Sequence, residues 1–262
     1  MVTTKAVKST ALITLKGNWA LLCAQAMVPV FATIIIVLSC VLFSLPFGQI
    51  ASCVIFALSF VFILSPIWLG VIRTYWRKAN GVTDGVSGCF YYFSKKANYK
   101  RSLKYSFKVL LHWLRVALVL LLPVILIHVA TDSEIYELFG ISIPLFLMNL
   151  RYLDVVFHAV ALVLATVHLI NLYLPAFIFV SCEDMNPSEC FFRGVEIGRY
   201  TKSRFFAHFL GFFGWILLSF LLIPLLFTLP YLLMSYVVEC RYNVAFYNLS
   251  GQQQRKTPIY NV

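Results

Sequence analysis

Charged residues are scarce in this sequence. Only 12% of the 262 residues are Asp, Glu, Lys or Arg, whereas 61% are hydrophobic, and the mean hydropathy is +0.87. A soluble globular domain has about 25% charged residues, because its surface must be hydrated. The composition therefore excludes an ordinary soluble domain and predicts an all-α integral membrane protein.

Motifs of the common enzyme classes are also missing. The chain has no G-x-x-x-x-G-K-[ST], H-E-x-x-H or G-x-S-x-G pattern, and these patterns mark nucleotide-binding loops, zinc peptidases and serine hydrolases. The seven cysteines form no C-x-x-C pair and no cluster with the spacing of zinc ligands. We therefore predict no enzymatic activity, no catalytic residue, no metal and no cofactor, and we interpret the cysteines as small packing residues.

Six apolar segments are long enough to cross a bilayer, whose hydrocarbon core takes roughly 20 helical residues. They predict a polytopic protein that forms a single integral membrane domain over residues 1–262. The last segment is the weakest because it contains Glu239, Arg241 and Asn243. The predicted spans are about 19–45, 50–72, 109–130, 155–181, 205–228 and 230–249.

Basic residues are concentrated in alternate connections of this scheme. The N-terminal flank, the links after the second and fourth spans and the C-terminal part from Arg241 onward hold 19 of the 21 Lys and Arg residues. Cytoplasmic loops are enriched in these residues, so we expect a multi-pass protein of the cell membrane with both termini in the cytoplasm. The formal charge of +11 then lies beside anionic headgroups, so the predicted partners are membrane lipids and not nucleic acid. The sequence names no protein partner.

A basic stripe lies between the second and third spans. It consists of Lys96, Lys100, Lys104 and Lys108. Tyr99, Leu103 and Phe107 follow the same four-residue repeat one position earlier. In a helix the two sets form adjacent stripes, which predicts an interfacial amphipathic helix with its lysines directed at anionic headgroups.

A second interfacial helix is predicted after the fourth span. Asn186 is placed as an N-cap, Pro187 as the first helical residue and Glu189 as the third. Arg193 and Glu196 continue a charged face at helical spacing. Both a solvated connector and a docking surface fit this pattern.

One ionisable residue is predicted near the middle of the membrane. Glu239 lies about 13 Å into the last span at 1.5 Å per residue, and a lone carboxylate there is costly. Arg241, two residues away, points elsewhere on a helix. We therefore expect a partner for Glu239 on another span, with His168, Asn171 and Arg115 as the candidates. Such a cluster can order the helices or carry a solute.

Short motifs near the span ends resemble a known family. They are "LKGNW" (Leu15–Trp19), Gly70 with Arg73, "EDMNPSEC" (Glu183–Cys190), "FFGW" (Phe212–Trp215) and "LPY" (Leu229–Tyr231). In this order they resemble an uncharacterised family of six-span bacterial integral membrane proteins, common in Gram-positive bacteria and known as a domain of unknown function. The resemblance implies a six-span architecture and no particular chemistry.

Two functional classes fit these observations. The first is a non-enzymatic envelope or scaffold protein of the bacterial cytoplasmic membrane that interacts with lipids. The second is a transporter of a lipid or small solute through a polar cavity near Glu239, because prolines in five spans permit broken helices. The two halves of the chain show no internal repeat, which favours the first class.

Overall fold

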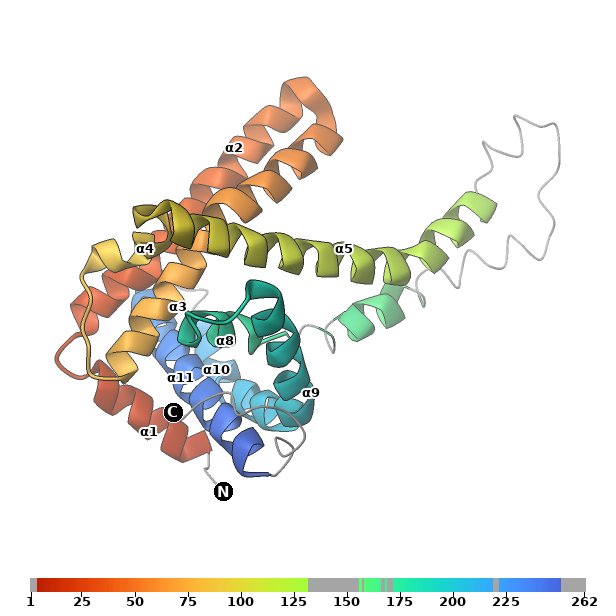
Figure 1. Ribbon diagram of the computed structural model, residues 1–262. Helices are drawn as coiled ribbons and strands as arrows, with labels where there is room; N and C mark the ends of the chain where they lie inside the picture. Colours follow the sequence, from red (N-terminus) through yellow and green to blue (C-terminus); the bar gives the residue numbers. More distant parts are fainter. Residues whose placement is uncertain are drawn as a thin grey trace, which may run out of the picture. The chain divides into compact units, whose positions relative to one another are not determined.

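The structure is a computed structural model, and all the regular elements in its described residues are helices. This confirms the all-α class. The described residues are 4–131, 156, 158–165, 168, 172–218 and 222–250. The chain forms two compact units, residues 1–108 with 171–262 and residues 109–170, and each is described by itself (Figure 1).

The first unit begins with a short helix and a helical hairpin. Helix α1 (Thr4–Leu15) buries Val7, Ala11 and Leu15 and packs against α11 (Leu222–Leu249). Helix α2 (Trp19–Ser59) contains one non-helical residue, Gly48, with φ at 80°. Because glycine adopts positive φ without a Cβ clash, the chain reverses there and α2 forms two arms (Figure 1). The reversal falls within the connection predicted between the first two spans.

Two helical segments are long and apolar enough to cross a membrane. They are Trp19–Ser44, with a mean hydropathy of 2.7, and Ala51–Ala79, with a mean hydropathy of 2.4. The second segment continues from α2 through a π-helix (Phe60–Leu64) into α3 (Ser65–Ala79). No other helix in the described part of the chain meets the same test, so the six-span architecture stays a prediction.

The fourth predicted span, 155–181, contains a break. Leu172–Leu174 form a turn and bend, and Pro175 then begins α8 (Pro175–Ser181). Proline suits the first position of a helix because it lacks the N–H that would have no partner there. Helix α8 packs against α9 (Pro187–Gly211). A Cβ on Gly194 would lie 2.3 Å from the Pro175 Cα, so this crossing requires glycine.

The boundaries near the C-terminus differ from the prediction. Asn186 caps α9 as expected, accepting a hydrogen bond from the Ser188 N–H at 3.1 Å. However, α9 is 25 residues long and so joins the predicted interfacial helix to the start of the fifth span. The next helices are α10 (Phe213–Leu218) and α11, and α11 continues through Pro230, where the last two spans were expected to separate.

One aromatic contact bears on the predicted topology. The Trp19 and Phe227 rings lie 6.5 Å apart, whereas the six-span scheme places these residues on opposite sides of the membrane.

Lys8 of α1 donates a hydrogen bond to the carbonyl oxygen of Gly211, the last residue of α9, and its ammonium lies 4.5 Å from the centre of the Phe212 ring. A cation at a helix C-terminus complements the helix dipole. Helix α1 thus stabilises the end of α9.

The lysine stripe begins a longer helix than predicted. After a 3₁₀ helix (Val86–Phe90) and α4 (Tyr91–Ser94), helix α5 runs from Lys96 to Thr131 without interruption. Its buried face in the first unit is formed by Ser102, Tyr105 and Ser106, while Phe107 of the expected apolar stripe is 54% exposed. Phe107 therefore lies off the buried face of α5, whereas Tyr99 and Leu103 are partly buried.

The second unit contains the rest of α5 and the helical residues 156, 158–165 and 168. The Nε2 atoms of His112 and His168 lie 2.7 Å apart, and their rings stack with centres 4.9 Å apart. Apolar side chains here face outward, for example Leu118 at 66% and Val119 at 68% exposure.

Candidate functional site

Glu239 on α11 is 4% exposed and lies in a polar cluster. Its Oε1 accepts a hydrogen bond from the Asn243 amide at 3.0 Å, and its Oε2 lies 3.7 Å from Nδ1 of His208 on α9. The sequence predicted a partner from another span and named His168, Asn171 and Arg115. The side chain that approaches Glu239 from another helix is His208, for which the sequence predicted no role, and the two atoms are too far apart for a hydrogen bond.

The same polar cluster makes hydrogen bonds to Tyr173, which lies in the helix break before α8. Asn243 also donates to the Tyr173 hydroxyl at 2.9 Å, which lies 2.6 Å from the Thr201 hydroxyl. Tyr236 donates to the main-chain carbonyl of Tyr173 at 2.6 Å. The break leaves main-chain carbonyls without helical hydrogen-bond partners. The Tyr236 hydroxyl supplies a donor to one of them, the Tyr173 carbonyl. We call Tyr173, Thr201, His208, Glu239 and Asn243 the Glu239 cluster.

Several buried polar atoms along this part of α11 are left without a hydrogen bond. Within the described residues they are Asn243 Oδ1, Ser235 Oγ and Thr228 Oγ1 on this part of α11, together with His208 Nδ1 on α9. Thr228, Ser235, Glu239 and Asn243 follow one another by seven, four and four residues, so they share one face of α11. An unsatisfied buried group costs about 1–3 kcal/mol. The stripe is therefore more polar than helix packing alone requires.

The other predicted members of the cluster lie elsewhere. Arg241 places its guanidinium 6.0 Å from the centre of the Trp76 ring and is directed away from Glu239, as its spacing predicts. His168 contacts His112 within the second unit, and Arg115 is an exposed residue of that unit. Asn171 lies outside the described residues.

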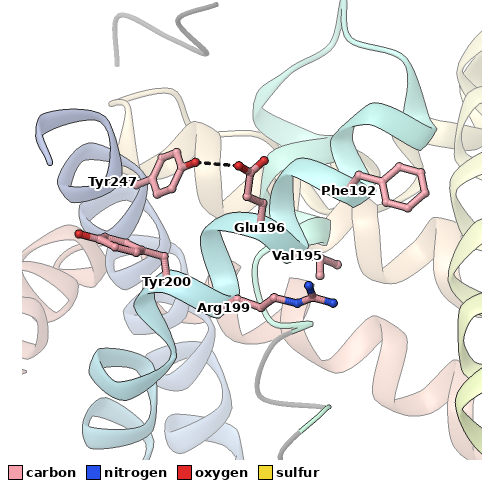
Figure 2. Close-up of a pocket in the computed structure, with 6 residues that line it drawn as sticks. All are labelled: Phe192, Val195, Glu196, Arg199, Tyr200 and Tyr247. Carbon is pink, nitrogen blue, oxygen red and sulfur yellow. Dashed lines mark hydrogen bonds between the residues drawn. The ribbon is translucent and has the colours of Figure 1, made fainter. Parts of the chain in front are cut away.

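A pocket of about 500 Å³ lies between α9 and the C-terminal end of α11. Figure 2 shows its lining, which combines aromatic, aliphatic and charged side chains. The lining residues are Phe192, Val195, Glu196, Arg199, Tyr200 and Tyr247. The Tyr247 hydroxyl donates to Glu196 Oε1 at 3.1 Å, and the other carboxylate oxygen lies 3.9 Å from Arg193 Nη1. The charged face of this helix was predicted from the sequence, whereas the contribution of Tyr247 from α11 was not.

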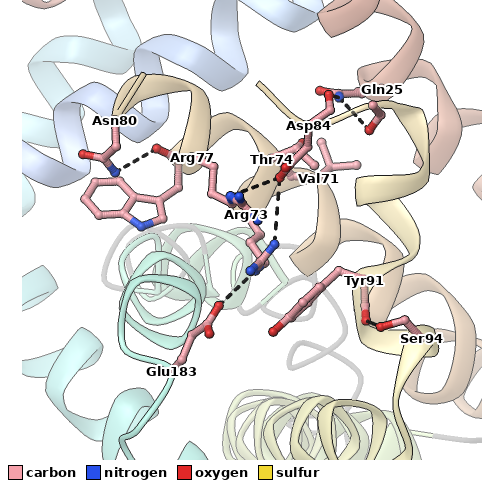
Figure 3. Close-up of polar contacts among 12 residues, drawn as sticks. Gln25, Val71, Arg73, Thr74, Arg77, Asn80, Asp84, Tyr91, Ser94 and Glu183 are labelled. Atoms are coloured by element: carbon pink, nitrogen blue, oxygen red, sulfur yellow. Dashed lines mark hydrogen bonds and ion pairs between the residues drawn. The ribbon is translucent and has the colours of Figure 1, made fainter. Parts of the chain in front are cut away.

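A network of ion pairs lies at the C-terminal end of α3 (Figure 3). Arg73, which is 9% exposed, donates to Glu183 at 3.0 Å and lies 3.9 Å from Asp84. Its guanidinium also lies 3.5 Å from the centre of the Tyr91 ring. Arg77 completes the network at 3.3 Å from Asp84. Each charged side chain in the network has a partner of opposite charge. The network therefore joins α3 to the segments that contain Asp84 and Glu183, and it leaves no obvious ligand site among these residues.

Arg101 has a comparable structural role within the lysine-rich segment. Its guanidinium donates to the carbonyl oxygens of Phe179 and Cys182 at the end of α8 and lies 4.2 Å from the centre of the Phe179 ring. Lys96, Lys100 and Lys104 remain exposed, and Lys108 is half-buried. Three of the four lysines are thus exposed while the arginine points inward, and the contact of the lysines with lipid stays a prediction.

Two cysteines have the character of packing residues. Burial raises the pKa of the Cys190 thiol to about 12 and that of the Cys89 thiol to about 11, and both side chains are 0% exposed. The reactive form is the thiolate, which is rare at neutral pH for both. Among the described residues no group of three or more His, Cys, Asp or Glu side chains is placed to hold a metal ion.

No family model, curated protein or solved structure matches this chain. The resemblance carried by the short motifs therefore stays a hypothesis. Two of those motifs do meet in space, since Arg73 pairs with Glu183.

Proposed function

We propose that this chain is a non-enzymatic, multi-pass protein of the bacterial cytoplasmic membrane. In this proposal it acts as an envelope-associated scaffold and contacts anionic lipid headgroups from its cytoplasmic side. Six spans and cytoplasmic termini belong to the proposal and rest on the apolar segments and the distribution of basic residues. The Trp19–Phe227 contact speaks against the last pair of spans in its simplest form.

The observation that carries the proposal is the inverted distribution of polarity. In α2, Ile35 is 63% exposed, Leu38 58% and Leu42 66%, whereas Glu239 and Asn243 are buried at 4% and 0%. Exposing apolar surface to water costs about 25 cal/mol per Å², and soluble monomers rarely expose patches above a few hundred Å². Lipid tails remove this cost.

Contact with headgroups is supported by the outward-facing lysines. Lys96, Lys100 and Lys104 are exposed in the first turns of α5, and the apolar part of the same helix follows. Each basic residue near an anionic leaflet contributes about 1 kcal/mol. The stripe therefore fits a position at the membrane surface.

Membrane extraction and lipid analysis test this proposal. The protein should resist alkaline carbonate extraction, and anionic lipids should be enriched among the lipids that co-purify with it relative to the bulk membrane. Release into the carbonate supernatant would contradict the membrane assignment. Co-purified lipids of bulk composition would contradict the headgroup contact alone.

Transport of a small solute is a second candidate function. It is favoured by the break at Leu172–Leu174, which lies beside the Glu239 cluster through Tyr173. Transporters bind their substrates where interrupted helices expose polar groups within the membrane. Replacement of Glu239 by Gln separates this candidate from a purely structural cluster, because it removes the charge and keeps a hydrogen-bond acceptor.

A further inference from the structure

The pocket on α9 contains a cation that no described residue neutralises. Arg199 lines the pocket and is exposed, and it forms no ion pair with any residue described in the structure. Glu196, in contrast, is held by the Tyr247 hydroxyl and lies near Arg193. The carboxylate is thus already engaged, and Arg199 is available to an anion.

A second cation lies beside one of the lining residues. The Lys108 ammonium lies 4.6 Å from the centre of the Phe192 ring, and Phe192 is a lining residue that is 58% exposed. The lining contains one arginine and one glutamate, and Lys108 beside Phe192 adds one more positive charge, so the positive charges exceed the negative by one. Because guanidinium groups bind phosphate through paired N–H donors, the charge balance favours a phosphate-containing ligand.

Beyond the exposed Lys202 and Ser203, the surface further along α9 is apolar. Phe206 follows Arg199 by seven residues, so it lies on the same side of α9 about 10 Å along the axis. Phe206 and Phe209 are each 46% exposed, and Leu210 is 53% exposed. A charged pocket with an exposed apolar strip further along the same helix matches a ligand with an anionic head and a hydrocarbon tail.

We propose that this pocket binds the phosphodiester headgroup of an anionic glycerophospholipid. Arg199 contacts the phosphate, Lys108 supplies a second positive charge beside Phe192, and the acyl chains lie along Phe206, Phe209 and Leu210. The aromatic rings of Tyr200 and Tyr247 form the wall behind the headgroup. A volume of about 500 Å³ lies within the range of small-ligand sites. The inference deepens the proposed headgroup contact and rests on it.

Native mass spectrometry of the detergent-purified full-length protein tests the site. Phosphatidylglycerol and phosphatidylcholine are titrated separately into the original protein and into Arg199→Gln. The variant should bind phosphatidylglycerol about fivefold to tenfold more weakly, because one basic residue near the surface contributes about 1 kcal/mol and tenfold corresponds to about 1.4 kcal/mol. Phosphatidylcholine binding should change less. Arg199→Lys keeps the charge and should recover part of the affinity.

Two further variants make the result specific. Lys5→Gln removes an exposed cation of α1 that does not line the pocket, so it should bind phosphatidylglycerol as the original protein does. Glu196→Gln removes the negative charge and should strengthen phosphatidylglycerol binding; weaker binding would overturn the assignment of the ligand's charge. An unchanged melting temperature of Arg199→Gln establishes that it is folded.

The outcomes separate this inference from the proposed function. If the original protein prefers phosphatidylglycerol and Arg199→Gln shows the same preference, the pocket assignment is overturned while headgroup contact elsewhere stands. If the original protein shows no preference, headgroup contact itself fails. If inorganic phosphate at millimolar concentration displaces the lipid, the pocket is a site for soluble phosphate and the lipid assignment is overturned.

Discussion

Replacement of Glu239 tests what the buried cluster does. Glu239→Gln retains an oxygen that can accept the Asn243 hydrogen bond, which is 3.0 Å long, and it removes the charge. Glu239→Leu removes the acceptor and leaves an Asn243 N–H without a partner in a site where Asn243 is 0% exposed. A buried unsatisfied donor costs about 1–3 kcal/mol, whereas one retained hydrogen bond is worth about 1 kcal/mol.

These values give different melting temperatures for the two variants. In a chain of this size 1 kcal/mol shifts the melting temperature by about 2–4 °C. A loss of about 2 kcal/mol in Glu239→Leu should therefore lower the melting temperature by about 4–8 °C, while Glu239→Gln should stay within about 4 °C of the original protein. Lys202→Leu, at an exposed position of α9, is the control for introducing leucine and should have a small effect.

Thermal unfolding in detergent, followed by tryptophan fluorescence, measures these shifts. Equal melting temperatures for the original protein and Glu239→Leu would refute the hydrogen-bonded cluster. A Gln variant that is folded and stable but fails to complement a deletion strain would show that the charge serves a function. That result would favour the solute transporter over the scaffold.

Four further predictions follow from other parts of the chain. Gly70→Ala should destabilise the protein by about 1–3 kcal/mol through overpacking, because the new Cβ would lie 2.0 Å from the Cys89 carbonyl oxygen; Gly214→Ala, which meets no atom within 4 Å, should be tolerated in the same unfolding assay. At pH 8, maleimide should label Cys190 only after the protein is unfolded, since burial raises the pKa of this thiol to about 12 and the thiolate is the reactive form. Rapid labelling of Cys190 in the folded protein would contradict its burial. Simultaneous replacement of Lys96, Lys100 and Lys104 by Gln should lower the enrichment of anionic lipids in the purified protein by up to about 3 kcal/mol of binding free energy, and unchanged enrichment would remove the role of the stripe. Cysteines introduced near Lys96 and Arg199 should react with a membrane-impermeant reagent only from the cytoplasmic side, and those introduced in residues 132–137 only from outside; the reverse pattern would invert the topology.

Features set by neighbouring residues could be predicted from the sequence. The Asn186 cap depends on a hydrogen bond to Ser188, two residues away, and the reversal in α2 depends on Gly48 beside Pro46. The all-α class follows from the apolar segments, since helices satisfy their backbone polar groups internally. Such signals need no knowledge of the tertiary arrangement.

Features set by distant contacts could not be predicted in this way. The approach of His208 to Glu239 brings together residues 31 positions apart on two helices, and several polar residues had similar spacing relative to the predicted spans. The packed face of α5 was not predicted because it contains serines, and polar residues in a helix usually indicate an exposed face. In the structure Ser106 donates to Ser65 on α3 at 2.6 Å. Small hydroxyl side chains therefore form this close contact. Pro230 was taken as a boundary, yet α11 continues through it, as membrane helices often do.

The accessibility of a spin label on α2 tests the central claim, that this hairpin lies in lipid. The protein is reconstituted into bilayers after its accessible cysteines have been replaced. A spin label is attached at Leu42→Cys, a position that is 66% exposed. Lys100→Cys, on the exposed stripe of α5, serves as the reference. Oxygen concentrates in the hydrocarbon core, whereas a polar nickel complex stays in water. Membrane insertion predicts that the Leu42 label collides more often with oxygen than with the nickel complex, with the opposite ratio at Lys100. A Leu42 label that collides mainly with the nickel complex would contradict the membrane assignment.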